Sequence, residues 1–133
     1  MTLGFEAREG ESPFTKPAGE ACRHLCSAGC GIYAARPDAC RSFQCVWHVR
    51  PSLGASLRPD RCGVLLAANQ NPLAKGLAIF AYELRPGALE GKAVRRLVQE
   101  LSQAHTVILV KEDGGRDVLT RDPSVARRLS RSA

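Results

Sequence analysis

The chain has 133 residues, of which 44% are hydrophobic and 24% are charged, and its formal net charge is +6. That length corresponds to one domain with enough residues to bury an apolar core. No apolar run approaches the ~20 residues that a transmembrane helix needs. The opening "MTLGFEAREGESPF" lacks the basic start and apolar stretch of a secretory signal. We therefore expect a protein of the cytoplasm with no membrane-spanning segment.

The composition changes along the chain in three steps. Residues 1–21 mix Gly, Pro, Ser and charges without periodicity, which indicates an extended lead-in. Residues 22–50 hold five of the six cysteines and are expected to form a small cysteine-rich, metal-binding lobe. Residues 51–133, which begin with a Pro- and Gly-containing connector at 51–62, are expected to form an α+β scaffold. We expect these parts to make one compact domain overall.

The first three cysteines are spaced by four residues. A continuous helix would place Cys22, Cys26 and Cys30 on one face. Eight residues of helix rise about 12 Å, whereas two cysteines that share one zinc ion keep their Cα atoms within roughly 10 Å. Cys22 and Cys30 can therefore bind one ion only if the chain bends between them. Ser27 and Gly29 disfavour a helix interior, so we predict a turn or a broken helix here.

The next cysteine is predicted to lie in a short helix, "PDACRSF". Pro37 suits the first turn of that helix, and the charge of Asp38 is favourable near its N-terminus. Cys40 would then lie in the early turns, where backbone N–H groups and the helix dipole favour a thiolate. Phe43 and Trp47 are expected to be core aromatics that pack against the rest of the protein.

The pattern of the scaffold alternates between strands and helices. Apolar and aromatic runs predict four strands. Residues 69–76, between the first and the second of these strands, have the composition of a turn. Helical spacing of the apolar residues predicts one helix, and Asp122 followed by Pro123 marks the start of another that extends through Leu129. The strands are expected at 62–68, 77–85, 105–112 and 116–121, and the first helix at 92–103. The order β-β-α-β-β-α indicates an α+β fold.

Two details of the scaffold point to its topology. The uninterrupted Val-Ile-Leu-Val centre of the 105–112 strand indicates a central position in the sheet. Asp113-Gly114-Gly115 has the composition of a hairpin turn and predicts that this strand pairs with the next one.

Five cysteines within 24 residues indicate a metal site, because a reducing compartment disfavours stable disulfides. A site of four thiolates around Zn²⁺ has a formal charge of −2, which nearby cations can balance by donating to sulfur. The expected surrounding residues are His24, Arg36, Arg41 and His48. Either histidine could instead bind the metal itself. Cys62 precedes a predicted strand and is expected to be a small buried residue outside the site.

The stretch "GCGIYAARPDACRSFQC" resembles the C-x-I-Y-x-x-R-P-x-x-C-R-x-F-x-C signature of a family of zinc- or iron-chelating cysteine-cluster domains (YkgJ-like). The resemblance extends over residues 16–48, about a quarter of the chain. The residues in register are Cys30, Ile32, Tyr33, Arg36, Pro37, Cys40, Arg41, Phe43 and Cys45. It implies a cytoplasmic, bacterial-type metal-binding protein.

The resemblance also implies which cysteines are ligands: Cys22, Cys30, Cys40 and Cys45. Cys26 has no secure counterpart in the signature. It is a spare thiol, an alternative ligand or a contributor to a cluster.

Three classes of function remain open from the sequence. A four-cysteine site without an open position indicates structural zinc. Four cysteines are also the usual ligands of an iron–sulfur cluster, so the alternative is an electron carrier or redox partner that contains iron. The third is a basic nucleic-acid-binding module. The sequence contains no aromatic-rich basic stretch that would support it. An enzyme has the least support, since no third residue orients a Cys–His pair. The sequence assigns no substrate and no partner.

Overall fold

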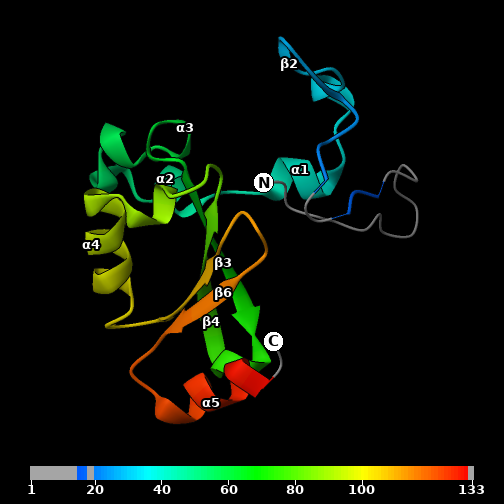
Figure 1. Ribbon diagram of the computed structural model, residues 1–133. Helices are drawn as coiled ribbons and strands as arrows, with labels where there is room; N and C mark the ends of the chain where they lie inside the picture. Colours follow the sequence, from blue (N-terminus) through cyan, green and yellow to red (C-terminus); the bar gives the residue numbers. More distant parts are fainter. Residues whose placement is uncertain (1–14, 18–19, 132–133) are drawn as a thin grey trace. The chain divides into compact units, whose positions relative to one another are not determined.

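The computed structural model describes residues 15–17 and 20–131, and it contains a mixed four-stranded sheet, several helices and a small two-stranded sheet (Figure 1). The predicted α+β fold is confirmed. The chain divides into Met1–Phe43, here called unit 1, and Gln44–Ala133, called unit 2. The division falls inside the 22–50 segment that the sequence grouped together. Most of the expected lead-in lies outside the described residues.

Unit 1 consists of short elements: β1 (Leu25–Cys26), β2 (Gly29–Cys30), the 3₁₀-helix η1 (Tyr33–Ala35) and α1 (Asp38–Ser42). The two strands form an antiparallel hairpin in which Leu25 pairs with Cys30 and Cys26 pairs with Gly29. Gly29 has a φ of 109°, a value that favours glycine. The predicted bend between Cys22 and Cys30 is confirmed and is a tight turn, and the predicted helix around Cys40 is also present.

The described residues of unit 1 include almost no buried side chains. Among its described residues only Lys16 and Pro37 are buried. Leu25 and Tyr33 are 65% and 66% exposed, and Phe43 is 43% exposed. The expectation that Phe43 is a core aromatic is therefore wrong. The five-residue helix α1 and the hairpin of two two-residue strands offer no apolar face on which this ring could pack.

Unit 2 begins with a series of short helices: α2 (Val46–Val49), η2 (Pro51–Leu53), η3 (Ala55–Leu57) and α3 (Pro59–Cys62). The last three of these helices occupy the predicted connector at 51–62, whereas α2 lies in the segment 22–50. Trp47 is partly buried, and its Nε1 donates to the carbonyl oxygen of Gly54 at 2.7 Å. This bond ties α2 to the turn between η2 and η3.

The rest of unit 2 confirms the predicted order β-β-α-β-β-α. Its elements are β3 (Val64–Asn71), η4 (Pro72–Ala74), β4 (Gly76–Glu83), η5 (Ala88–Glu90), α4 (Lys92–Leu101), β5 (Thr106–Val110), β6 (Arg116–Leu119) and α5 (Pro123–Arg131).

The four strands lie in the order β3-β4-β5-β6. The outer pairs are antiparallel, whereas β4 and β5 are parallel. Parallel neighbours need a crossover connection, which η5 and α4 supply. The predicted central position of the Val-Ile-Leu-Val strand is confirmed, since β5 pairs on both sides.

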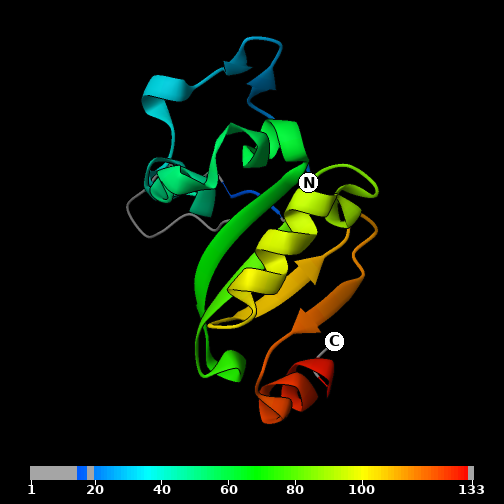
Figure 2. The ribbon, with the colours of Figure 1, turned by 90° about the vertical axis from the view of Figure 1, so that its left-hand side faces the viewer.

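Helix α4 lies across one face of the sheet (Figure 2) and buries its apolar side there. Because side chains alternate along a strand, every second residue faces this helix. The core residues of α4 are Val94, Leu97, Val98 and Leu101, and their partners on the sheet include Val64, Leu66, Ile79, Ala81 and Val107. Burying one such side chain is worth about 1.5–3 kcal/mol, so this contact stabilises unit 2 substantially.

Two side chains secure the ends of the sheet. In the predicted hairpin turn between β5 and β6, Asp113 Oδ1 accepts from the backbone N–H of Gly115 at 2.8 Å. At the end of β4, the carboxylate of Glu83 is only 7% exposed. It accepts from the backbone N–H groups of Leu89 at 3.3 Å and Glu112 at 3.1 Å.

Helix α5 starts at the cap that the sequence predicts. Asp122 Oδ1 accepts from the backbone N–H groups of Ser124 at 2.8 Å and Val125 at 3.3 Å. The hydroxyl of Ser124 also donates to this carboxylate, and Lys75 Nζ lies 3.1 Å from Oδ2. These donors hold the pKa of Asp122 far below its ordinary range. In the described part of the chain, every helix is too short or too polar to cross a lipid bilayer.

We predict that Asp122→Ala lowers the melting temperature by on the order of 5 °C, because the amides that begin α5 lose their acceptor. Asp122→Asn should lose less, since an asparagine also caps. The depressed pKa means that the carboxylate stabilises the fold above its ordinary pKa, and that this contribution disappears as the pH falls through the lower folded-state pKa. Thermal melts at pH 7 and pH 3 should show a smaller difference between wild type and Asp122→Asn at pH 3.

We predict that Glu83→Ala destabilises the protein by about 2–4 kcal/mol, because two backbone N–H groups lose a buried acceptor. Urea unfolding measures this loss. The control is Glu90→Ala, which removes a carboxylate that is 76% exposed and 3.8 Å from Arg95; its cost should stay below about 1 kcal/mol. Equal effects of the two variants would contradict the role given to Glu83.

Candidate metal centre

The five clustered cysteines are distributed over both units. Cys22, Cys26, Cys30 and Cys40 lie in unit 1, whereas Cys45 lies in unit 2 as the residue before α2. Cys22 and Cys45 are partly buried, and the other three are exposed. All six cysteines of the chain, Cys62 included, are free thiols.

The hairpin and α1 bring three of the predicted ligands toward one another. Cys22 starts a turn in which its carbonyl oxygen accepts from the N–H of Leu25 at 3.0 Å, and β2 then returns the chain so that Cys30 pairs with Leu25. Although Cys40 is an exposed residue, desolvation of its thiol, and then the charges of Cys22 and Cys30, raise the pKa of Cys40. The three sulfurs are therefore close enough to interact through their charges.

The raised pKa of Cys40 corrects one expectation. The sequence predicted that the start of a helix favours the thiolate form of Cys40, yet the net shift has the opposite sign. Helix α1 has only five residues, and the neighbouring thiols act against its dipole. Thiolates gathered in this way repel one another unless a cation lies among them.

Two arginines hold the loop that leads from the hairpin to α1. Arg41 donates from Nε to the carbonyl oxygen of Arg36 at 3.0 Å and from Nη2 to that of Ala34 at 2.8 Å. The guanidinium carbon of Arg36 lies 3.8 Å from the centre of the Tyr33 ring, a cation–π contact. The charge of Arg36 also lowers the pKa of Cys40, as expected of a cation beside the thiols, although the net shift is upward. The guanidinium of Arg41 is instead engaged with the backbone.

The two histidines near the cysteines differ in their surroundings. His24 is partly buried in the hairpin, where its carbonyl oxygen accepts from the N–H of Gly31 at 2.7 Å. His48 is exposed in α2 and belongs to unit 2. Cys26 is exposed in β1, opposite Gly29.

Lys16 is a residue near the thiols that the sequence does not predict. This lysine is only 8% exposed, its Nζ donates to the carbonyl oxygen of Pro17 at 3.2 Å, and its charge lowers the pKa of Cys40. The residue stands six positions before the first cysteine, in a stretch without periodicity. No local pattern could have marked it, because its effect depends on how the chain folds back toward α1.

Cys62 belongs to unit 2. It is partly buried against the core, and its sulfur is 3.5 Å from the carbonyl oxygen of Leu57 and 3.4 Å from that of Val64. This environment agrees with the expectation of a small residue that packs.

Within residues 15–17 and 20–131, no three His, Cys, Asp or Glu side chains are close enough together to hold a metal ion. The structure thus brings Cys22, Cys30 and Cys40 within electrostatic range without bringing them to coordination distance. The four-cysteine ligand set stays a prediction. No protein-family model, curated protein or solved structure matches this chain. The family resemblance therefore rests on the Cys30–Cys45 signature itself.

We predict that Arg41→Lys and Arg41→Gln both speed hydrogen exchange of the Cys40 amide, by about tenfold. This amide donates to Pro37 at 2.9 Å in the first turn of α1. A lysine keeps the charge but cannot bridge two carbonyl oxygens as a guanidinium does. Exchange measured by NMR tests this. Wild-type protection in Arg41→Lys would show instead that only the charge of Arg41 matters.

Proposed function

We propose that this protein binds a metal ion through Cys22, Cys30, Cys40 and Cys45, and that the ion is a structural Zn²⁺. Four thiolates fill the tetrahedral coordination of zinc and leave no position for a substrate. The bound ion would then stabilise the cysteine-rich part of the chain and catalyse no reaction itself. The proposal includes membership in the cysteine-cluster family that the signature resembles.

The observation that carries the proposal is that the hairpin and α1 bring Cys22 and Cys30 near enough to Cys40 for their charges to raise its pKa. The hairpin at Gly29 removes the geometric obstacle of a straight helix, in which Cys22 and Cys30 could not share an ion. Cys22 and Cys30 both act on Cys40 through their charges. Cys45 follows Cys40 by five positions in the chain, a span short enough for both to reach one ion.

The near absence of a core in unit 1 gives the ion a physical role. Segments of fewer than about 70 residues rarely gain much stability from an apolar core alone, and they often need disulfides or a metal. The described residues of unit 1 bury only Lys16 and Pro37, and its cysteines are unpaired. A metal ion would draw the thiolates together and replace their repulsion by attraction. Metal binding and local folding would then be one process.

An iron–sulfur cluster would use the same four cysteines. Iron and zinc differ in one simple property, since an iron–sulfur cluster absorbs visible light and Zn²⁺ does not. The exposed Cys26 is the thiol that could enlarge the ligand set in either case.

The experiment is elemental analysis and visible spectroscopy of protein purified without oxygen. We expect about one zinc per chain and no visible absorbance. Serine variants of each of the four cysteines should lose most of the metal. Cys62→Ala is the matched control, because this thiol packs against the core of unit 2, and it should retain the metal.

Four results would contradict the proposal. The site would be excluded if the purified protein held no metal. It would also be excluded if all four serine variants kept as much metal as the wild type. Loss of metal in Cys62→Ala would mean that the ligands are wrongly assigned. A brown protein with iron would replace zinc by the iron–sulfur alternative. The result for Cys26→Ser decides whether that thiol is a ligand.

A further inference from the structure

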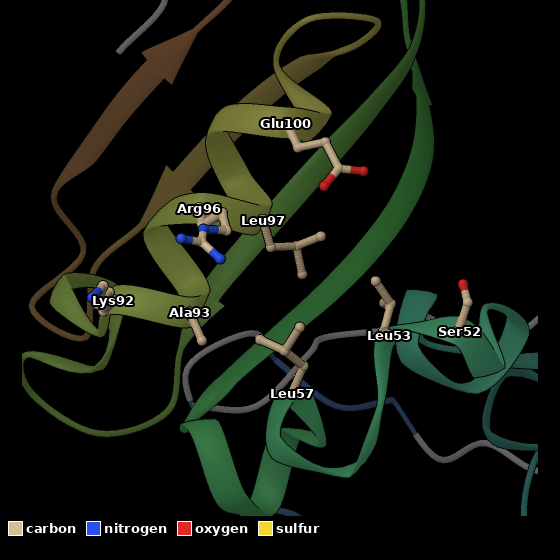
Figure 3. A pocket seen from close by; sticks show the side chains of 8 residues that line it. All are labelled: Ser52, Leu53, Leu57, Lys92, Ala93, Arg96, Leu97 and Glu100. Atoms are coloured by element: carbon tan, nitrogen blue, oxygen red, sulfur yellow. The ribbon is translucent and has the colours of Figure 1, made fainter.

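A groove of about 530 Å³ runs beside α4 in unit 2 (Figure 3). One wall consists of Leu53 from η2 and Leu57 from η3, both partly buried. The other wall consists of Ala93 and Leu97 on α4. The groove therefore presents an apolar floor that is assembled from segments distant in the sequence and open to solvent.

The rim of this groove is charged, and its charges are separated along α4. Lys92 and Arg96 stand one helical turn apart, about 6 Å along the axis, at one end. Glu100 follows one turn further on. Figure 3 shows the three side chains along the same side of the helix. The rim thus has a positive end and a negative end.

The two cations on the rim are not engaged within the protein. Among the described residues, neither Lys92 nor Arg96 has an ion pair or a side-chain hydrogen bond. Their neighbour Arg95, on the same helix, lies 3.8 Å from Glu90 and does not line the groove. Two adjacent cations without partners repel each other, and an anion placed between them would remove that repulsion.

We propose that the groove binds a small organic acid with one anionic group and an apolar body. The volume falls within the range of ordinary ligand pockets, about 300–1,000 Å³. Lys92 and Arg96 would hold the carboxylate, and the apolar body would lie over Leu53, Leu57 and Leu97. Glu100 disfavours a second carboxylate at the far end, so the groove selects monoacids over diacids. This site is separate from the cysteines and does not depend on the metal proposal.

The test uses a series of unbranched probes and NMR shifts of the α4 amides in the full chain. Butanoate, hexanoate and octanoate should bind with affinity that rises about threefold to fourfold per buried methylene. Hexanoate should bind more tightly than hexanol, which lacks the charge. Octanedioate should bind more weakly than octanoate, and Glu100→Gln should reduce this difference.

The variants separate the charge from the apolar floor. Lys92→Gln combined with Arg96→Gln should abolish the advantage of hexanoate over hexanol and leave the dependence on chain length. Ala93→Phe should fill the groove and weaken all the probes, without a cost in folding because Ala93 is exposed. Arg95→Gln is the matched control on the same helix and should bind every probe as the wild type does.

The proposal is overturned if no probe shifts the α4 amides in a saturable manner. It is also overturned if hexanoate and hexanol bind equally well, since the cations would then play no part. The same conclusion follows if Arg95→Gln weakens hexanoate as much as the double variant does, because the effect would come from net charge alone.

Discussion

The parallel pairing of β4 with β5 is the constraint on which unit 2 depends. Two parallel strands cannot be joined by a tight turn, so the chain must leave the sheet after Glu83 and return at Thr106. The connection contains α4, and its apolar side covers the face of the sheet that it crosses. The core and the groove beside α4 both follow from this crossover. At the start of this crossover, the carboxylate of Glu83 accepts hydrogen bonds from the backbone N–H groups of Leu89 and Glu112.

Unit 1 is stabilised by different interactions. Its described residues form a two-residue hairpin and a five-residue helix, linked by arginine–carbonyl bonds and a cation–π contact. Such contacts fix local geometry, but they bury little apolar surface. Desolvation, and then the charges of Cys22 and Cys30, raise the pKa of Cys40, so its thiolate form is disfavoured unless a cation accompanies it. A group of thiols in a unit whose described residues bury little apolar surface is physically suited to fold around a metal ion.

The outline of unit 2 could be predicted from the sequence because its signals are local. Three of these signals depend only on neighbours within a few residues: the Asp122 cap, the Asp113 turn and the helical spacing of the apolar residues in α4. The limits of β3 could not be predicted. It begins at Val64 because Cys62 ends α3 and Gly63, with a φ of 75°, closes that helix. It continues through the polar residues Asn69–Asn71, which resemble a turn, because they pair with β4.

The α+β class, the order of the strands and helices from β3 to α5, and the bend between Cys22 and Cys30 all follow from the sequence alone. Which side chains meet depends on the tertiary packing. Lys16 approaches Cys40 through the fold of unit 1, and Phe43 stays exposed because the short elements described in unit 1 offer it no apolar face. The groove likewise joins the wall of Leu53 and Leu57 to α4, across more than 30 positions of the chain. Spacing and periodicity report contacts within one element, whereas these contacts depend on how separate elements pack.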